Sequence, residues 1–565
     1  MVNVKNLFGM AVMATALVGC SSNDNLAPDG KDNVGKTGEA YASFTINLPT
    51  TTGNGTRGDE PVVKDGTPSF AEGTAAEYEV KNGTILIFDN AGNFVTSAQL
   101  GTMNPWIPVK KDGVTTAAIT TVKLSGVSVG GDYQALVLLN NDVDATTSKV
   151  TLPTTGETYA EWSKDTLMVN AEKYASTDGI FMANAPKYID TESQPTTLVK
   201  VENVCASREE AQAKAATTVY VERGLAKVTM QDFTAGGYKV AEGTYKNDNV
   251  EIKNWQLDVT NKSTFPVHQI GGTGFAAIWS TPRFYDGDNK TFKRVYWGVD
   301  PNYSGATLQN LTACKNAFTM IGKDDIVGET GNDHPQYCLE NTFDLGNMMQ
   351  GQTTRVVFKA VYTPSALVET TEKTFYKIGN NTAIWTKANL EKQIKTVALT
   401  AMCITDATEQ GKYGVKLDAT NNNISGEAGQ HLIKAENITY TGEASDSKVD
   451  QTAVNTINEK LGLSANAGIA TYLDGVTYYI ARIKHFNELP WTAGEGYGTE
   501  IGKYLGRYGV LRNNWYDLSV TSISGLGYPD IPEVKPTVPD DENEQYINVE
   551  VKILSWAKRS QQIKL

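Results

Sequence analysis

The stretch Ala40-Tyr41-Ala42-Ser43-Phe44-Thr45-Ile46-Asn47-Leu48-Pro49 carries a small or apolar side chain at every even-numbered position. Successive side chains of a β-strand point to opposite faces, so this alternation is typical of a strand with one buried face. Pro49 lacks a backbone N–H and ends the pattern. The sequence therefore predicts a half-buried strand whose core face is formed by Ala42, Phe44, Ile46 and Leu48.

A second alternating stretch lies near the other end of the chain, at Tyr546-Ile547-Asn548-Val549-Glu550-Val551-Lys552-Ile553-Leu554-Ser555-Trp556. Its core-type residues are Ile547, Val549, Val551 and Ile553, and apolar side chains continue at Leu554 and Trp556. The preceding residues, 525–544, are rich in acids and contain Pro529, Pro532, Pro536 and Pro539. This composition predicts an extended, semi-rigid linker that contributes nothing to a core.

The loop after the first strand reads Thr50-Thr51-Thr52-Gly53-Asn54-Gly55-Thr56-Arg57-Gly58-Asp59. Small, polar and glycine residues of this kind form exposed loops that proteases cut. Arg57 is the only arginine before Arg208. An Arg-specific protease would therefore find one site in this part of the chain, between Arg57 and Gly58.

The middle of the chain repeats short strand patterns separated by turn residues. With 565 residues and about 100–200 residues per domain, two to four domains are expected. We predict a mainly β fold of two tandem β-sandwich domains, at residues 58–235 and 236–527. Short helices are expected at residues 207–215 and 454–461.

The N-terminus predicts export. Residues 1–19 have a lysine followed by an apolar run that is too short to span a bilayer, as in a signal peptide. The run ends in Leu17-Val18-Gly19-Cys20, which resembles a bacterial lipobox, in which Cys20 receives acyl chains such as palmitate and becomes the first mature residue. Residues 20–57 would then comprise a tether and the first strand.

The composition argues against several classes of function. A formal net charge of −14 disfavours nucleic acid as a partner, and four histidines leave little material for catalysis or metal binding. Gly126-Val127-Ser128-Val129-Gly130 matches a hydrolase nucleophile motif, but a strand rather than a helix follows it, which favours a hairpin loop. We expect no enzymatic activity, no cofactor and no metal. Whether the other cysteines form disulfides or free thiols stays open: Cys205, Cys314, Cys338 and Cys403.

The two terminal strands suggest exchange between molecules. If the first strand fills a groove in its own domain, cutting after Arg57 frees it, and the vacated groove has open backbone edges and an apolar floor. The last strand of another copy, with the same alternation, could complete that groove and build a filament. The alternative from the bare pattern is that both strands simply pair within one subunit.

These features together resemble the fimbrillins, the protease-assembled type V pilins of anaerobic Gram-negative bacteria. The resemblance rests on the lipobox, on the strand and loop up to Arg57, and on three segments: Val221-Glu222-Arg223-Gly224-Leu225-Ala226-Lys227-Val228, Val510-Leu511-Arg512-Asn513-Asn514-Trp515-Tyr516 and Val549-Glu550-Val551-Lys552-Ile553-Leu554-Ser555-Trp556. It implies two transthyretin-like sandwich domains and a lipidated precursor at the outer membrane. It also implies cleavage after Arg57, which makes Gly58 the new N-terminus. Residues 546–556 would be the donor strand, and residues 528–565 would comprise the linker and this strand together.

The resemblance thus implies a fimbrial shaft subunit that supports adhesion and colonisation. Its partners would be further copies of itself, related anchor and tip subunits, an Arg-specific protease and, before cleavage, the outer membrane. Its location would be the fimbrium and the cell surface, reached through the periplasm. The alternative is a monomeric cell-surface lipoprotein that binds glycan or a host protein. Whether the subunit is a shaft or a minor accessory subunit stays open.

Overall fold

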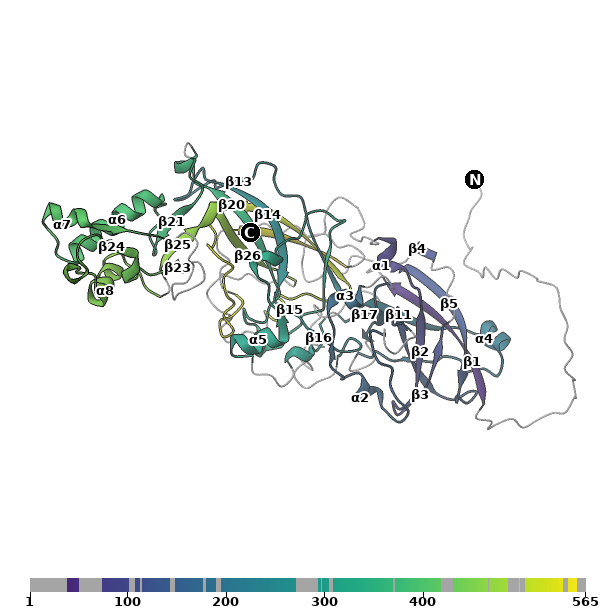
Figure 1. The fold of residues 1–565 in the computed structure, drawn as a ribbon. Coiled ribbons are helices and arrows are strands. Elements are labelled where there is room, and N and C mark those ends of the chain that lie inside the picture. The colour runs from purple at the N-terminus through teal and green to yellow at the C-terminus, as the bar shows by residue number, and fades with distance from the viewer. Residues whose placement is uncertain are drawn as a thin grey trace, which may run out of the picture. The chain divides into compact units, whose positions relative to one another are not determined.

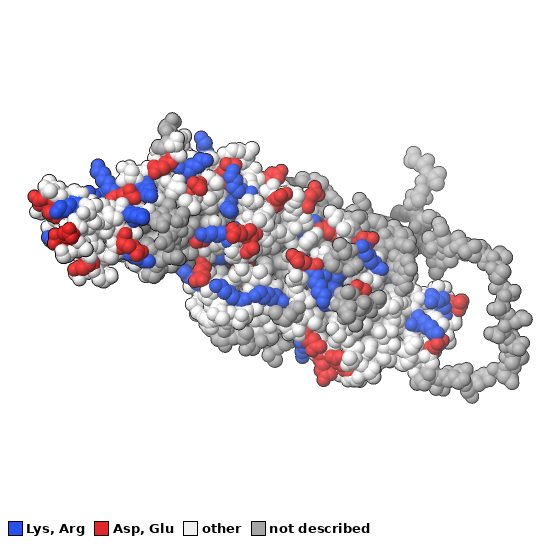
Figure 2. Space-filling model, viewed as in Figure 1, with Lys and Arg blue, Asp and Glu red and all other residues white. Residues whose placement is uncertain are grey.

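The computed structural model describes residues 38–49, 74–100, 107–111, 114–142, 148–175, 179–188, 195–270, 293–295, 297–303, 308–368, 371–417, 430–465, 467–485, 497, 504–541 and 547–555. These residues are mainly β, as predicted. None of the helices in these ranges is long and apolar enough to cross a membrane. Figure 2 shows acidic and basic side chains interspersed over the described part of the face in view.

The first half of the chain forms one nine-stranded sheet (Figure 1). Its strand order is β3 (Phe94–Gln99), β2 (Gly83–Asp89), β6 (Tyr133–Leu139), β8 (Met182–Asn184), β11 (Thr217–Arg223), β1 (Glu39–Pro49), β5 (Val114–Ser125) and β4 (Ile107–Lys111), with β10 (Val199–Lys200) beside β6. Side chains from both halves of the sheet share one buried cluster, which includes Phe44, Ile87, Val122, Val137 and Val219. The sheet therefore curves around a common core.

Two further sheets pack on each other in the second half. One has the order β19 (Gln336–Cys338), β12 (Ala226–Met230), β27 (Asn514–Ile523) and β28 (Ile547–Ser555), and the other β13 (Tyr238–Lys239), β14 (Asn249–Asp258), β20 (Arg355–Thr363) and β26 (Val476–Arg482). Their core contains Val228, Trp255, Phe358, Tyr479 and Tyr516, which come from both sheets. A two-layer arrangement around one core follows, as predicted for a sandwich.

A helical module is inserted between β20 and β26. Figure 1 shows its helices α6 (Lys387–Ala401), α7 (Ala407–Lys412) and α8 (Gln451–Lys460) grouped near its short strands. These strands are β21 (Phe375–Ile378), β22 (Tyr413–Val415), β23 (Gln430–His431), β24 (Ile438–Tyr440) and β25 (Ile469–Tyr472). The sequence predicted α8 but missed α6, although Leu390, Ile394 and Ala398 are buried at a spacing of one helical turn.

The remaining elements are short. The α-helices are α1 (Ala75–Tyr78), α2 (Tyr159–Trp162), α3 (Ala171–Tyr174), α4 (Arg208–Ala213), which the sequence predicted, and α5 (Leu311–Ala317). Two-residue strands pair as β15 (Thr260–Asn261) with β18 (Phe318–Thr319), β16 (Ser263–Thr264) with β7 (Leu167–Met168), and β17 (Lys293–Arg294) with β9 (Lys187–Tyr188). The 3₁₀ turns are η2 (Pro301–Tyr303), η3 (Lys323–Asp325), η4 (Leu345–Asn347), η5 (Ser365–Leu367), η6 (Ala435–Asn437), η7 (Ala444–Asp446) and η8 (Leu473–Gly475).

The chain passes from the first sheet to the second between β11 and β12. β12 pairs in parallel with β27, although the sequence-based boundary at residues 235 and 236 assigned it to the first domain. The physical reason lies at Gly224, where a Cβ atom would approach the rings of Tyr174 and Phe181 to about 3 Å. Only glycine fits this crossing, which divides one alternating run into strands of two different sheets.

Buried polar contacts reinforce this crossing. Arg223 at the end of β11 donates from Nε to the carbonyl of Glu77, at 2.8 Å, and from Nη1 to Oδ1 of Asn513, at 3.3 Å. The Glu77 carboxylate contacts Lys227 Nζ at 2.7 Å, and that ammonium lies 3.8 Å from the ring centroid of Trp515. Charges buried this deeply must be paired, so these contacts fix how β11 leads into β12.

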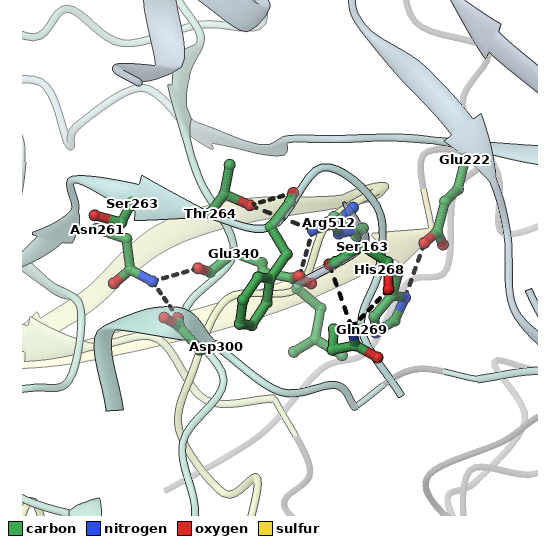
Figure 3. A network of polar contacts seen from close by, with 12 residues as sticks. Ser163, Glu222, Asn261, Ser263, Thr264, His268, Gln269, Asp300, Glu340 and Arg512 are labelled. Carbon is green, nitrogen blue, oxygen red and sulfur yellow. Dashed lines mark hydrogen bonds and ion pairs between the residues drawn. The ribbon is translucent and has the colours of Figure 1, made fainter. Parts of the chain in front are cut away.

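A second network lies beside the crossing (Figure 3). Glu222 on β11 contacts His268 Nδ1 at 2.8 Å, and Arg512 donates to Glu340 at 2.5 Å. Burial opposes ionisation of Glu340, but the Arg512 guanidinium and His268 outweigh it and lower the pKa of that carboxyl. Asp300 accepts hydrogen bonds from Asn261 and Asn302, yet its burial raises its pKa from 3.8 to about 7.

Asp300 therefore makes stability depend on pH. Because its folded-state pKa is raised, the folded protein holds a proton that the unfolded chain releases, and stability falls as pH rises from about 4 to about 7. We expect Asp300→Asn to lose this dependence. Relative to the parent, the variant should gain about 2–4 kcal/mol in unfolding free energy between about pH 4.5 and about pH 7.5. Urea unfolding at both pH values measures this, with the exposed Asp324→Asn as control. If the unfolding free energies of variant and parent changed equally with pH, the raised pKa of Asp300 would be contradicted.

Candidate strand-exchange site

The predicted removable strand, β1, lies inside the first sheet and not at its edge. It pairs in parallel with β11, from Phe44 opposite Thr217 to Asn47 opposite Tyr220. On its other side it pairs antiparallel with β5 along its whole length. Loss of β1 would therefore leave two unpaired backbone edges facing each other, which we call the β1 site.

The core face of β1 matches the predicted alternation. Ala40, Ala42, Phe44 and Ile46 have no exposed surface and pack into the core of the first sheet. Burial of side chains as large as Phe44 and Ile46 contributes about 1.5–3 kcal/mol each. The side chain of Leu48, the fourth predicted core residue, lies outside the described residues.

The opposite face of β1 is covered by residues 205–214, which contain α4 and which we call the strap. The backbone N–H of Tyr41 donates to the Cys205 carbonyl at 2.9 Å, and Cys205 N–H donates back at 2.8 Å. Arg208 Nη1 reaches over to the Thr121 carbonyl on β5, at 3.0 Å. The strap therefore runs from the β11 side of β1 to the β5 side.

Ser43 is the polar centre of this covered face. Its hydroxyl donates to the Ala211 carbonyl in the strap at 2.8 Å and lies 2.8 Å from the Thr121 hydroxyl on β5. Ser43 has one hydroxyl proton, which it uses for Ala211, so the Thr121 hydroxyl donates to Ser43. The sequence analysis missed this contact because no local pattern links residues that are 168 and 78 positions apart.

The four cysteines among the described residues have free thiols. Cys205, Cys314 and Cys338 are buried and Cys403 is exposed, and none of the four forms a disulfide. Burial raises the pKa of the Cys205 thiol, and it raises that of Cys338 to about 12. Among the described residues, no group of three or more His, Cys, Asp or Glu is arranged to hold a metal ion.

The predicted donor strand, β28, pairs within its own chain. It runs antiparallel to β27, from Asn514 opposite Ser555 to Ile523 opposite Ile547. Val549 is 8 % exposed and belongs to the core between the second and third sheets. Among the described strands, β28 lies at the end of its sheet's order and pairs with one neighbour, whereas β1 pairs with two.

The linker before β28 is packed, which corrects the prediction that it contributes nothing to a core. Val534 is buried against the cluster that contains Phe318. The Pro532 carbonyl accepts from Arg355 at 2.8 Å, and Asp540 accepts from Thr353 at 2.8 Å and from Tyr497 at 2.5 Å. Burial raises the pKa of Asp540. Prolines prevent regular pairing of this segment, but its carbonyls and acids can still accept hydrogen bonds from the domain surface.

Other predicted site residues have no structural test. Cys20, Arg57, Gly58 and Trp556 lie outside the described residues. The side chains of Ile547, Val551, Ile553 and Leu554 also lie outside them, although their backbone forms β28. The segment Gly126-Val127-Ser128-Val129-Gly130 forms a loop between β5 and β6, with both terminal glycines at positive φ. Because β5 and β6 are not neighbours in the sheet, it is not the predicted hairpin loop.

Comparison with solved structures gives weak similarities. Two are candidate cell adhesion proteins: one from Parabacteroides distasonis, with 11 % identity and a TM-score of 0.38 over 93 % of this chain and 99 % of that chain, and one from Bacteroides eggerthii, with 11 % identity and a TM-score of 0.34 over 94 % and 99 %. The fimbrial anchor protein Mfa2 from Porphyromonas gingivalis has 12 % identity and a TM-score of 0.21 over 56 % and 77 %.

Comparison of the sequence is more informative. No protein of curated function matches the chain. The family model for the C-terminal part of fimbrillin, the major fimbrial subunit protein type IV, matches residues 470–562. This segment contains β27, the packed linker and β28, which are the elements around the predicted donor strand. In these C-terminal residues, the chain is similar to the C-terminal part of fimbrillin.

Proposed function

We propose that the protein is a structural, non-enzymatic subunit of a fimbrial shaft that polymerises by donor-strand exchange. The observation that carries the proposal is the interior position of β1, between β11 and β5, immediately before the loop that contains Arg57. The precursor is lipidated at Cys20 and carried to the outer membrane. An Arg-specific protease cuts between Arg57 and Gly58, and β1 leaves with the lipidated segment.

The pairing pattern gives the exchange a direction. Within its own subunit, β28 pairs with one described strand, β27. In the β1 site of another subunit it would pair with two strands, β11 and β5. At about 1 kcal/mol net per backbone hydrogen bond, the second ladder favours the exchanged state. Before cleavage β1 occupies the site, and the uncut chain has both terminal strands paired at home. Cleavage therefore opens the site.

The contact is heterologous, because the donor and acceptor surfaces differ, so it extends into a filament and does not close. The partners are further copies of this chain and related anchor and tip subunits. The fimbrium on the cell surface supports adhesion and colonisation. A second candidate function, a monomeric surface lipoprotein that binds glycan or a host protein, is favoured by the home pairing of both terminal strands.

The first test concerns cleavage. Purified full-length protein treated with an Arg-specific protease should start at Gly58 and form fibres visible by electron microscopy, whereas Arg57→Gln should stay uncut there and monomeric. A second variant carries a recognition site for an unrelated protease in place of residues 56–59. Adding that protease should cut this variant and restore fibres. Fibres from uncut Arg57→Gln protein would contradict the proposal.

The second test concerns the donor strand. Deletion of residues 546–565 should abolish fibres after cleavage, because no strand remains to donate, whereas deletion of residues 560–565 should leave them intact. Circular dichroism melting checks that both truncated proteins stay folded. The cleaved 546–565 deletion still has an open β1 site, so substoichiometric amounts should shorten fibres of the full-length protein. Unchanged fibre lengths would favour the monomeric surface lipoprotein.

A further inference from the structure

The polar contacts of Ser43 restrict which residue of an incoming strand can lie beneath the strap. Ser43 is 6 % exposed. At that position the buried Ala211 carbonyl accepts a hydrogen bond from the strand, and the half-buried Thr121 hydroxyl donates one to it. A buried carbonyl left without a donor is costly, so the occupant must donate to Ala211, and an acceptor for Thr121 completes the match.

Two registers place all four core residues of 547–553 on core positions of β1 between Ala40 and Leu48, if the strand runs in the direction of β1. The first places Ile547 at the position of Ala40, and Glu550 then falls at the position of Ser43. The second shifts the strand by two residues, and Asn548 falls there instead. A shift by one residue is excluded because it would turn the apolar face outward.

The chemistry of the covered position separates the two registers. A glutamate carboxylate has acceptor oxygens only, so it can accept from Thr121 but would face the Ala211 carbonyl with no proton to donate, in a site shielded from water. An asparagine amide has both a donor and an acceptor: its NH₂ can donate to the Ala211 carbonyl, and its oxygen can accept from the Thr121 hydroxyl. Asn548 therefore reproduces both contacts of Ser43.

The core face favours the same register. In the first register Ile547 and Val549 would replace Ala40 and Ala42, which have no exposed surface, and this would overpack the core. In the second register Ile547 enlarges only Ala42, and the chain before it, with Gln545, leads in past the position of Ala40. The other three core residues of the donor then replace Phe44, Ile46 and Leu48, which are large: Val549, Val551 and Ile553.

The remaining polar residues also fit the second register. Glu550 would take the place of Thr45, opposite Ile119 on β5, whose side chain is 76 % exposed. A carboxylate there stays in water. Lys552 would take the place of Asn47, which is 8 % exposed, so its aliphatic stem would lie along the sheet and carry the ammonium beyond the end of β1 toward solvent.

We propose that the donor strand occupies the β1 site with Asn548 in the place of Ser43, so that the strap residue Ala211 and Thr121 on β5 set the register of the filament. This inference rests on the proposed strand exchange. Asn548 and Thr121 act as register-determining residues at the contact between two copies of the chain.

Disulfide trapping tests the register. Opposed residues of antiparallel strands are close enough for a disulfide, and Thr45, whose place Glu550 would take, lies opposite Ile119. In a Cys403→Ser background, filaments of Ile119→Cys/Glu550→Cys, which keep Thr121 and Asn548, should form covalent ladders on non-reducing gels under mild oxidation. The matched pair Ile119→Cys/Lys552→Cys, which would be opposed only in the first register, and the single-cysteine variants should form none.

The outcomes separate the two proposals. Ladders from Ile119→Cys/Lys552→Cys, or intact Ile119→Cys/Glu550→Cys filaments without ladders, would overturn the register and leave strand exchange standing. Cleaved parent protein that never forms filaments would instead overturn the proposed function.

The rate of fibre growth gives a second readout. Asn548→Asp should slow elongation at least about tenfold, since the carboxylate cannot donate to Ala211, whereas Asn548→Ser should stay near the parent rate because it restores the hydroxyl found at Ser43. Equal melting temperatures of the uncut variants show that the home position of β28 is unaffected. Equal elongation rates for Asn548→Asp and Asn548→Ser would overturn the proposed role of the Asn548 amide.

Discussion

The structure depends on the placement of β1 as an interior strand with a backbone ladder on each side. Its core residues, among them Phe44 and Ile46, complete the apolar cluster of the first sheet, and its polar face is closed by the strap. Loss of an edge strand would not create such a site, because it would leave only one open backbone edge. In the proposed exchange, the two edges that β1 leaves behind would accept a strand from another copy.

The β1 site is tied directly to the sheet that holds β28. β11, which pairs with β1, continues through Gly224 into β12, which pairs with β27, and β27 pairs with β28. Arg223 and Lys227 reinforce this path with buried contacts on either side of the crossing. In a filament of the proposed kind, the two ends of each subunit would therefore be joined by a short, continuous and well-packed route.

Some features were beyond sequence reasoning for physical reasons. The run from Thr217 to Met230 reads as one strand, because alternation records only which side chains are buried and not which sheet buries them. The composition of the linker predicts little regular secondary structure, and its described part contains no helix or strand. Its tight packing depends on hydrogen bonds that Arg355, Thr353 and Tyr497 donate to it. Such partners lie far away in sequence and leave no local pattern.

The sequence by itself determined the mainly β class, the two alternating terminal strands and the short helix at residues 208–213, because these follow from local periodicity and capping. Only the tertiary structure decided that β1 is interior, that β28 rests on β27, and that Ser43 lies between Ala211 and Thr121. These facts depend on which distant segments meet, and hydrophobic alternation is compatible with many such pairings. Hydrogen-bond partners and shape select one of them.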